Sequence, residues 1–297
     1  MGRVSFYDEV RRNRRSSLIL AAVLVVVVVA LAYSLAFLLA PGSEVAVLVL
    51  TMVFMGFYVY GSFVGGDRVL LSSTGAVPAV GDEWVYLRDT VEGLSIAAGI
   101  PAPAVYVIHS DEINAFATGR DPEHASVAVT TGLVRLLDRQ ELEGVVAHEV
   151  SHVRNQDIMF MTLVAVMVGL VAILSHVILR TFRFRGRRGR DRGGLGVAVL
   201  AVGFVLAVFA PLLTRLVQLA VSRRREFMAD ASGVELTRYA GGLASALEVI
   251  RDHNRGVMDV SEAVSHLFFV DPNRSALDAL YATHPPVDER IRRLRAM

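Results

Sequence analysis

The segment His148-Glu149-Val150-Ser151-His152 combines the residue types that hydrolytic zinc chemistry requires. An α-helix turns about 100° per residue, so it places His152 about 40° round from His148 and one turn further on. Glu149 lies on the same flank, and this face therefore offers two imidazoles and a carboxylate. Hydrolysis by a zinc enzyme needs two neutral nitrogen ligands and a nearby base that need not bind the metal. The alternative is a surface helix with polar residues four positions apart.

The flanking sequence predicts a largely buried helix for this motif. Asp138 followed by Glu141 has the pattern of a capping box. An apolar stripe follows at helical spacing, formed by Leu142, Val145, Val146 and Val150. Imidazoles and a carboxylate buried on such a helix need a metal ion or hydrogen-bond partners.

The composition indicates a membrane protein. The chain has 297 residues, 54% of them hydrophobic, and its mean hydropathy is +0.49, which is too apolar for an ordinary soluble protein. The net charge is +1, so nothing global argues for nucleic acid. The sequence has no cysteine, which excludes disulfides, thiolate metal sites and a cysteine nucleophile.

Four long apolar runs predict two hydrophobic helical hairpins. Residues 18–40 and 45–64 form the first pair, and arginines before residue 18 place its open end in the cytoplasm. Residues 158–179 and 195–213 form the second pair, with an arginine-rich loop between them. A spanning second hairpin would put these arginines outside, against the positive-inside tendency. Alternatively, it enters only partway, and the arginines contact anionic lipid headgroups; nucleic acid is a weaker alternative.

The sequence between residues 67 and 157 reads as a small α+β domain. Residues 84–99 predict an amphipathic helix, and residues 104–108, 113–117 and 126–131 predict strands. We therefore expect a small antiparallel sheet beside the motif helix. The predicted domains are an amino-terminal hairpin (1–66), a catalytic domain (67–157), a second hairpin (158–222) and a helical catalytic part with the third ligand (223–297).

The third metal ligand has to come from elsewhere in the chain, because a catalytic zinc usually takes three protein ligands and leaves one position for water. Asp157 should face about 140° away from His152 on a continuing helix, and His176 lies inside an apolar run. Glu226 is therefore the best candidate. Asp230, one turn later, is placed to accept the second N–H of a ligating histidine; a solvated helix face is the alternative reading.

Three motifs in this order resemble the HtpX-type membrane zinc endopeptidases, which are relatives of the eukaryotic CAAX prenyl endopeptidases. They are the segments 148–152, 225–230 and 283–290, and the resemblance covers nearly the whole chain. It implies a mixed α+β, zincin-like catalytic domain and one zinc ion per subunit. The implied zinc ligands are His148, His152 and Glu226, with Glu149 as the catalytic base.

The resemblance also implies residues that contact the substrate. His284 and Arg290 match family positions near the reacting carbonyl. An edge strand that holds the substrate backbone matches Asn114, Ala115, Phe116 and Ala117.

The function that follows is metal-assisted peptide hydrolysis. Zinc lowers the pKa of its bound water from 15.7 to about 7, Glu149 takes the proton and passes it to the leaving amine, and His284 or Arg290 supports the oxyanion. The resemblance implies quality control of misfolded or damaged membrane proteins by a multi-pass enzyme of the cell membrane, with its catalytic domain facing the cytoplasm.

Two alternative functions stay open. Prenyl-protein processing is disfavoured because the chain has only four apolar segments. A non-catalytic membrane scaffold with a structural zinc is disfavoured by Glu149, since a structural site closes its fourth position and has no use for a base.

Overall fold

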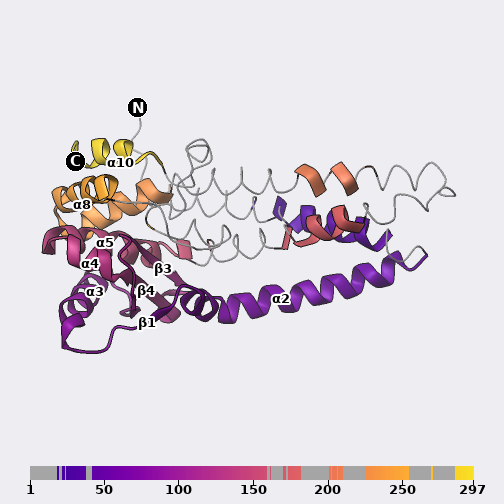
Figure 1. The fold of residues 1–297 in the computed structure, drawn as a ribbon, viewed down its shortest axis with the longest axis horizontal. Helices are drawn as coiled ribbons and strands as arrows, with labels where there is room; N and C mark the ends of the chain where they lie inside the picture. Colours follow the sequence, from indigo (N-terminus) through magenta and orange to yellow (C-terminus); the bar gives the residue numbers. More distant parts are fainter. Residues whose placement is uncertain are drawn as a thin grey trace. The chain divides into compact units, whose positions relative to one another are not determined.

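A computed structural model describes two compact parts of the chain (Figure 1). The first comprises Met1–Ser62 with Leu163–Gln218, and the second comprises Phe63–Thr162 with Leu219–Met297. The described residues are 19, 22–23, 25–37, 42–158, 161, 170–171, 173–181, 201, 203–205, 207–209, 225–253, 269 and 285–297. His284 and most of the arginine-rich loop lie outside these residues.

The described part of the first unit consists of apolar helical segments packed on one another. This part includes helical residues 25–37 and the beginning of α2, which runs over Glu44–Ser73. Its core is formed by Val27, Val28, Leu31, Met55, Leu170, Val171, Ile178 and Ala207. Among the described residues, no single helix combines the length and the apolar character that a membrane crossing requires.

Helix α2 is longer than the apolar run from which it was predicted. The run ends at residue 64, whereas α2 continues to Ser73, because charged residues in the following turns are compatible with a helix even though they end a hydrophobic stretch. Gly75 follows the helix with a φ of +67°, the left-handed conformation that favours glycine. The last carbonyls of α2 are capped by Thr74, whose hydroxyl donates to the carbonyls of Leu70 and Leu71.

The second unit is built on a four-stranded sheet. Its strands are β1 (Ala76–Pro78), β2 (Ala104–Ile108), β3 (Ala115–Gly119) and β4 (Ala125–Thr130), in the order β1-β2-β4-β3. The predicted wholly antiparallel sheet is wrong, because β2 and β4 are parallel. After β2 the chain forms the outer strand β3 and then folds back, so β4 inserts between them and runs the same way as β2.

Both faces of this sheet are covered, which explains why every residue of β3 and β4 is buried. Successive side chains of a strand point to opposite faces. Accordingly, Ala115 and Val129 join the core under the helices, whereas Phe116 and Ala128 pack on the other face with Leu70, Leu71, Ile108 and Met161. A strand buried on both sides reads as a continuous apolar run, so its register cannot be taken from polar alternation.

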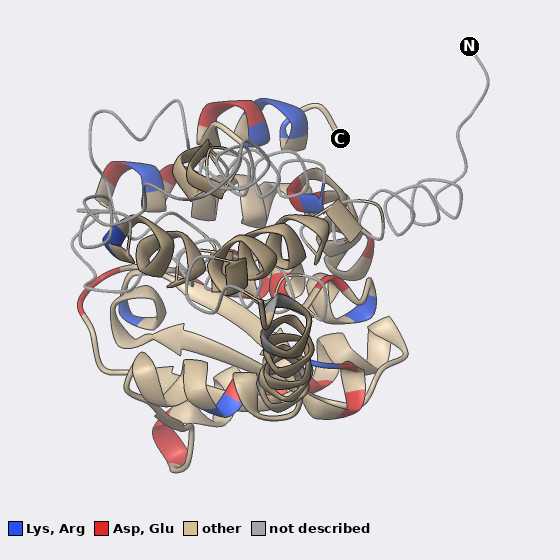
Figure 2. Ribbon diagram, turned by 90° about the vertical axis from the view of Figure 1, so that its right-hand side faces the viewer, with Lys and Arg blue, Asp and Glu red and all other residues tan. Residues whose placement is uncertain are grey.

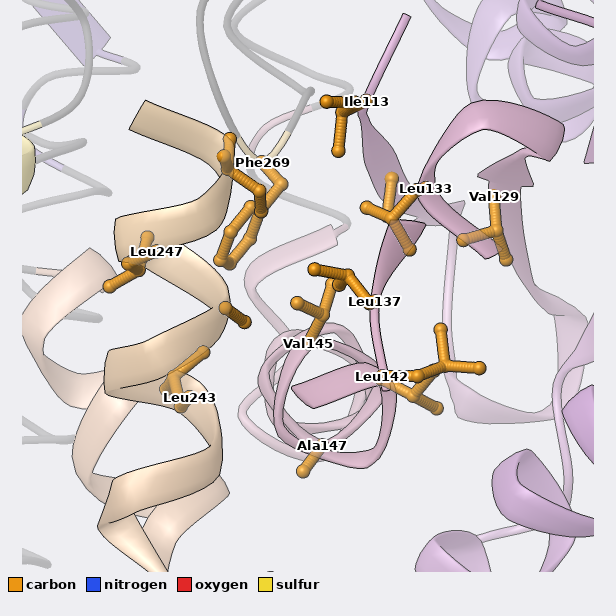
Figure 3. Close-up of a cluster of buried hydrophobic side chains, with 14 of the residues drawn as sticks. Ile113, Val129, Leu133, Leu137, Leu142, Val145, Ala147, Leu243, Leu247 and Phe269 are labelled. Atoms are coloured by element: carbon orange, nitrogen blue, oxygen red, sulfur yellow. The ribbon is translucent and has the colours of Figure 1, made fainter. Parts of the chain in front are cut away.

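The motif helix α5 (Arg139–Arg154) lies between the sheet and α8 (Ala240–His253). Figure 3 shows Val145 and Leu142 of α5 packed between Leu243 of α8 and Val129 of β4. The predicted capping box is confirmed: the Asp138 carboxylate accepts the Glu141 amide at 2.8 Å, and Glu141 Oε2 accepts the Asp138 amide at 2.9 Å. The predicted amphipathic helix is α3 (Val85–Ala98), and it ends at Gly99.

The described part of the second unit also contains two shorter helices. Helix α4 (Thr131–Leu136) begins at Thr130, whose hydroxyl accepts the amide of Leu133 at 3.3 Å. Helix α10 (Val287–Leu294) carries acidic residues in its first turn and basic residues in its last turn (Figure 2), a distribution that complements the helix dipole.

The approach of α5 to α8 depends on Gly144, and replacing it should destabilise the fold. A Cβ at this position would lie 2.6 Å from the Leu243 nitrogen and 2.8 Å from the Leu243 Cα. Alanine favours a helix by about 1 kcal/mol over glycine, but overpacking against backbone costs about 1–3 kcal/mol. We therefore expect Gly144→Ala to lower the midpoint of thermal unfolding.

The same substitution at Gly93 provides the control. Gly93 lies on α3, and a Cβ there would meet no atom within 4 Å. Gly93→Ala should therefore raise the midpoint slightly, through helix propensity alone. Equal shifts for the two variants would show that α5 and α8 are not limited by this contact.

Candidate metal centre

Three side chains from distant parts of the chain place ligand atoms around one point. His148 and His152 come from α5, and Glu226 comes from helical residues 225–237, here called the Glu226 helix. Their ligand atoms lie within 4.8 Å of one another. The two Nε2 atoms are 3.1 Å apart, and each lies 3.5 Å from an oxygen of Glu226. A tetrahedral zinc with Zn–N bonds of about 2.0–2.1 Å separates its ligand atoms by about 3.3 Å.

The other ring nitrogen of each histidine contacts a carboxylate. His148 Nδ1 lies 3.0 Å from Asp230 Oδ1, and His152 Nδ1 lies 3.2 Å from Asp157 Oδ2. A proton held at Nδ1 by such a bond leaves the lone pair on Nε2. Two imidazole nitrogens and a buried carboxylate that face one another need positive charge among them, which a divalent cation supplies. The donor set therefore fits a divalent metal ion.

The position of Asp157 differs from the sequence expectation, which had it face away from His152. That expectation assumed that the helix continues, but α5 ends at Arg154, and Gln156 has a φ of +58°. The chain leaves the helical path there and returns Asp157 to the ligand. Asn155 directly after the basic last turn is a helix-stop signal that could have revealed this turn.

Each of these two aspartates is paired with a buried arginine. Arg225 Nη1 lies 2.9 Å from Asp157 Oδ1. Arg290 binds Asp230 with two bonds, Nε to Oδ2 at 3.0 Å and Nη2 to Oδ1 at 2.7 Å. The sequence placed Arg225 close to the metal but did not indicate its pairing with Asp157, which was expected to face away.

Arg290 also contacts the predicted third ligand directly. Its Nη1 lies 3.3 Å from Glu226 Oε2, and its side chain is 1% exposed. The structure thus places the guanidinium against Glu226 and Asp230. Whether Arg290 also reaches the reacting carbonyl stays a prediction, as does the role of His284, which lies outside the described residues.

The electrostatics of the site favour positive charge between the ligands. For His152, burial lowers the pKa, but hydrogen bonds to Asp157 and Glu226 outweigh it and raise the pKa to about 10. Burial tends to raise the pKa of Asp230, yet Arg290 and His148 bring it below the ordinary value, so this carboxylate stays ionised.

The pKa of Glu149 is shifted in the opposite direction from that of Asp230. Glu149 is 2% exposed, and burial raises its pKa above the ordinary value, although His148 and His152 offset part of that effect. A carboxyl with a raised pKa holds a proton more readily near neutral pH, which suits a group that takes up and releases one.

A glycine lets the Glu226 helix approach the motif helix closely enough to bring its carboxylate to the histidines. Gly233 faces the backbone of α5, where a Cβ would lie only 3.2 Å from the His148 nitrogen. The Glu226 helix and α5 therefore meet nearly backbone to backbone, so their relative position is set by main-chain atoms rather than by flexible side chains.

The predicted substrate-binding residues lie at the edge of the sheet. Asn114 directly precedes β3, and Ala115, Phe116 and Ala117 are its first three residues. The amide of Thr130 in β4 donates to the Asn114 carbonyl at 3.0 Å, so in this antiparallel pair the backbone groups of Ala115 and Ala117 point to the side of β3 away from β4.

Phe269 contacts both this edge and the metal centre. Its amide donates to the Ala115 carbonyl at 2.7 Å. Its ring centroid lies 4.9 Å from that of His148 and 4.7 Å from Arg290 Cζ. Sequence reasoning did not identify Phe269, because a lone aromatic residue carries no signal for such a contact.

Removing the charge of Arg290 should destabilise the metal-free protein strongly. Arg290→Gln leaves the buried carboxylates of Asp230 and Glu226 without their cation, and breaking a buried ion pair in this way costs about 3–5 kcal/mol. We expect a large drop in the midpoint of thermal unfolding in EDTA, reduced when zinc is added.

Arg292 on the same helix is the matched control. It is exposed, and its Nε donates to the Asp288 carbonyl at 3.3 Å. Arg292→Gln should change stability by no more than about 0.5 kcal/mol. A shift as small for Arg290→Gln would contradict the charge balance described above.

Comparison with known proteins identifies the family. The model of peptidase family M48 matches residues 83–297. The chain is 43% identical over 248 residues to the "Protease HtpX homolog" of Caldanaerobacter subterraneus subsp. tengcongensis, covering 82% of this chain and 83% of that protein. It is 42% identical over 294 residues to the protein of that name from Dictyoglomus thermophilum, covering 99% and 95%. The predicted resemblance is therefore confirmed.

A solved structure shares the fold. The crystal structure of S. mikatae Ste24p matches with a TM-score of 0.54 at 20% identity, covering 88% of this chain. The match spans 61% of that protein, and at this low identity the likeness concerns the fold alone. Together with the family match and the relatives, the conclusion is that this chain belongs to peptidase family M48 and is a metalloendopeptidase.

Proposed function

We propose that this metalloendopeptidase uses one zinc ion held by His148, His152 and Glu226, with Glu149 as its base. The observation that supports this most directly is the set of three buried donors spaced 3.1–3.5 Å apart, as zinc requires. Glu149 is adjacent in sequence to one ligand and buried beside all three. A structural site would not need it.

Each residue of the site has its own role in the proposed reaction. Zinc bound at this site supplies a Lewis acid that brings the pKa of water to about 7. The Glu149 carboxylate takes the proton of the attacking water and delivers it to the leaving amine. Asp230 and Asp157 hold the imidazoles by their Nδ1 protons, and His284 donates to the developing oxyanion.

The substrate backbone pairs with the edge strand β3 in this proposal. The outward groups of Ala115 and Ala117 are available for the ladder that an added strand forms. The Ala115 carbonyl already accepts the Phe269 amide. A substrate strand therefore either begins at Ala117 or replaces Phe269 at Ala115, and backbone pairing of either kind tolerates many side-chain sequences.

The natural substrates, in this proposal, are misfolded or damaged membrane proteins. The apolar segments within 1–66 and 158–222 hold the enzyme in the cell membrane, and the catalytic parts 67–157 and 223–297 face the cytoplasm. The arginine-rich loop contacts anionic lipid headgroups. The apolar composition of the chain supports its placement in the membrane.

A degradation assay with purified protein tests the proposed activity. Wild-type protein with zinc should cleave an unfolded membrane protein, and chelation should stop cleavage until zinc is restored. Cleavage of a prenylated peptide alone would favour the prenyl-processing alternative, and zinc-dependent folding without cleavage of either substrate would favour the scaffold.

The orientation can be tested because the natural sequence has no cysteine. A single cysteine at Ser72 or Ala296 should resist an impermeant thiol reagent in intact cells and react after the membrane is opened. Ser72 is exposed near the end of α2, so a negative result in intact cells does not reflect burial. Labelling of either variant in intact cells would contradict a cytoplasmic catalytic domain.

A further inference from the structure

We propose that Asp157 and Arg225 form a positioning pair that couples two ligands of the metal centre, an inference that rests on the zinc site proposed above. Asp157 Oδ2 contacts His152 Nδ1 at 3.2 Å, while Asp157 Oδ1 contacts Arg225 Nη1 at 2.9 Å. One carboxylate therefore uses its two oxygens for a ligand and for an arginine. Arg225 immediately precedes Glu226, the third ligand.

The pair is built into the interior rather than placed on the surface. The side chains of Arg225 and Asp157 are 5% and 7% exposed. Arg225 Nη1 also lies 3.4 Å from the Asp157 backbone carbonyl, so it holds both the side chain and the chain turn that presents it. Burial lowers the pKa of Arg225, while the charge of Asp157 works against that shift.

A second pair on the other histidine shows the same arrangement. Asp230 contacts His148 Nδ1, and Arg290 binds Asp230. Each imidazole is thus held by an aspartate, and each aspartate is held by an arginine from another segment. The two pairs differ in one respect: Arg225 directly precedes the ligand Glu226 in the sequence. Its contact with Asp157 therefore connects the segment after α5 to the start of the Glu226 helix.

The expected effect of the pair is on metal binding and geometry. An aspartate that orients a ligating histidine raises the ligand's basicity, and its loss typically costs about 10–100-fold in metal affinity. Asp157→Asn keeps the shape and an acceptor oxygen but removes the charge. It should weaken zinc affinity about 10–100-fold and shift the visible absorption of the cobalt-substituted protein.

Arg225 acts through Asp157, which gives a second expected result. Arg225→Gln should weaken zinc affinity in the natural background, and Arg225→Lys should recover part of it. In the Asp157→Asn background, Arg225→Gln should add little, because residues that share one interaction are not additive. A residue that only supports the fold would lower the unfolding temperature without this dependence and without changing the cobalt spectrum.

The matched control is a surface pair that joins α5 to the Glu226 helix. Arg154 Nη1 at the end of α5 lies 3.2 Å from Glu235 Oε2 on the Glu226 helix, and Glu235 is 51% exposed. Arg154→Gln removes an arginine that bridges these helices without touching a ligand. Its zinc affinity and cobalt spectrum should equal those of the wild type.

The experiment measures zinc by competition with a chromophoric chelator, and cobalt by visible absorption. Unchanged zinc affinity and spectrum in Asp157→Asn, or an Arg225→Gln effect of equal size in both backgrounds, would overturn the positioning pair. If Asp157→Asn does not fold, the comparison of Arg225→Gln with Arg225→Lys decides, and equal affinities overturn the pair. A wild type that binds zinc no better than His152→Ala would instead overturn the metal centre, and the pair with it.

Discussion

Glu149→Gln should abolish peptide hydrolysis while zinc and the fold are retained. The change is nearly isosteric and removes only the charge and the proton acceptor. A general base contributes about 10²–10⁴-fold to a rate, and kcat should fall by at least that factor. Because the group is buried beside the ligands, removing its charge should not weaken the fold. Zinc content and thermal unfolding check this against the wild type.

The control for Glu149→Gln is Glu143→Gln on the same helix, outside the metal centre. It makes the same chemical change and should leave kcat unchanged. Turnover by Glu149→Gln at the wild-type rate would show that another group accepts the proton. Loss of zinc from that variant would instead make Glu149 part of the metal's binding set.

Glu226→Ala should release the metal, an effect different in kind from that of Glu149→Gln. Zinc binding in small structural sites is worth about 10–16 kcal/mol over four ligands, so one lost ligand costs roughly 3–4 kcal/mol, or about 10²–10³-fold in affinity. The loss should exceed this, because the negative charge that offsets the metal is lost with it. Zinc affinity of purified protein measures the effect, and Glu226→Gln should fall between the wild type and alanine.

The variant Asp230→Asn tests whether Glu226 or Asp230 is the metal ligand. Asp230 faces His148 Nδ1, on the side of the ring away from Nε2. Its loss should therefore weaken zinc less than Glu226→Ala does. Full zinc occupancy in Glu226→Ala together with a large loss in Asp230→Asn would transfer the ligand role to Asp230.

The local part of the site could be predicted from the sequence. Helix geometry alone predicts that two histidines and a glutamate at this spacing share one face. The capping box that begins ten residues before the first histidine predicts where the helix starts. The structure places His148, His152 and Glu149 on one buried helix with that cap. The strand at Ala104–Ile108 was likewise predicted with its observed bounds.

The features that could not be predicted from the sequence depend on contacts between distant segments. The parallel pairing of β2 and β4 follows from the insertion of β4 beside β2, which no local pattern records. The partnership of Arg225 with Asp157 depends on a left-handed residue, Gln156, that redirects the chain after α5. Both features escaped prediction for the same reason. The periodicity of apolar residues indicates a helix or a strand, but it does not show how that element ends or which direction the chain takes after it.

The position of Arg290 has a consequence for how the enzyme is made. Proteins are synthesised from the amino end, and the ligand-bearing segments emerge before α10. Until α10 docks, Glu226 and Asp230 lack the guanidinium that contacts both of them. A partly synthesised chain therefore carries all three proposed ligands without the charge balance of the finished site. Within the part of the chain that the structure describes, the charge balance around Glu226 and Asp230 is thus completed only when α10 folds against them.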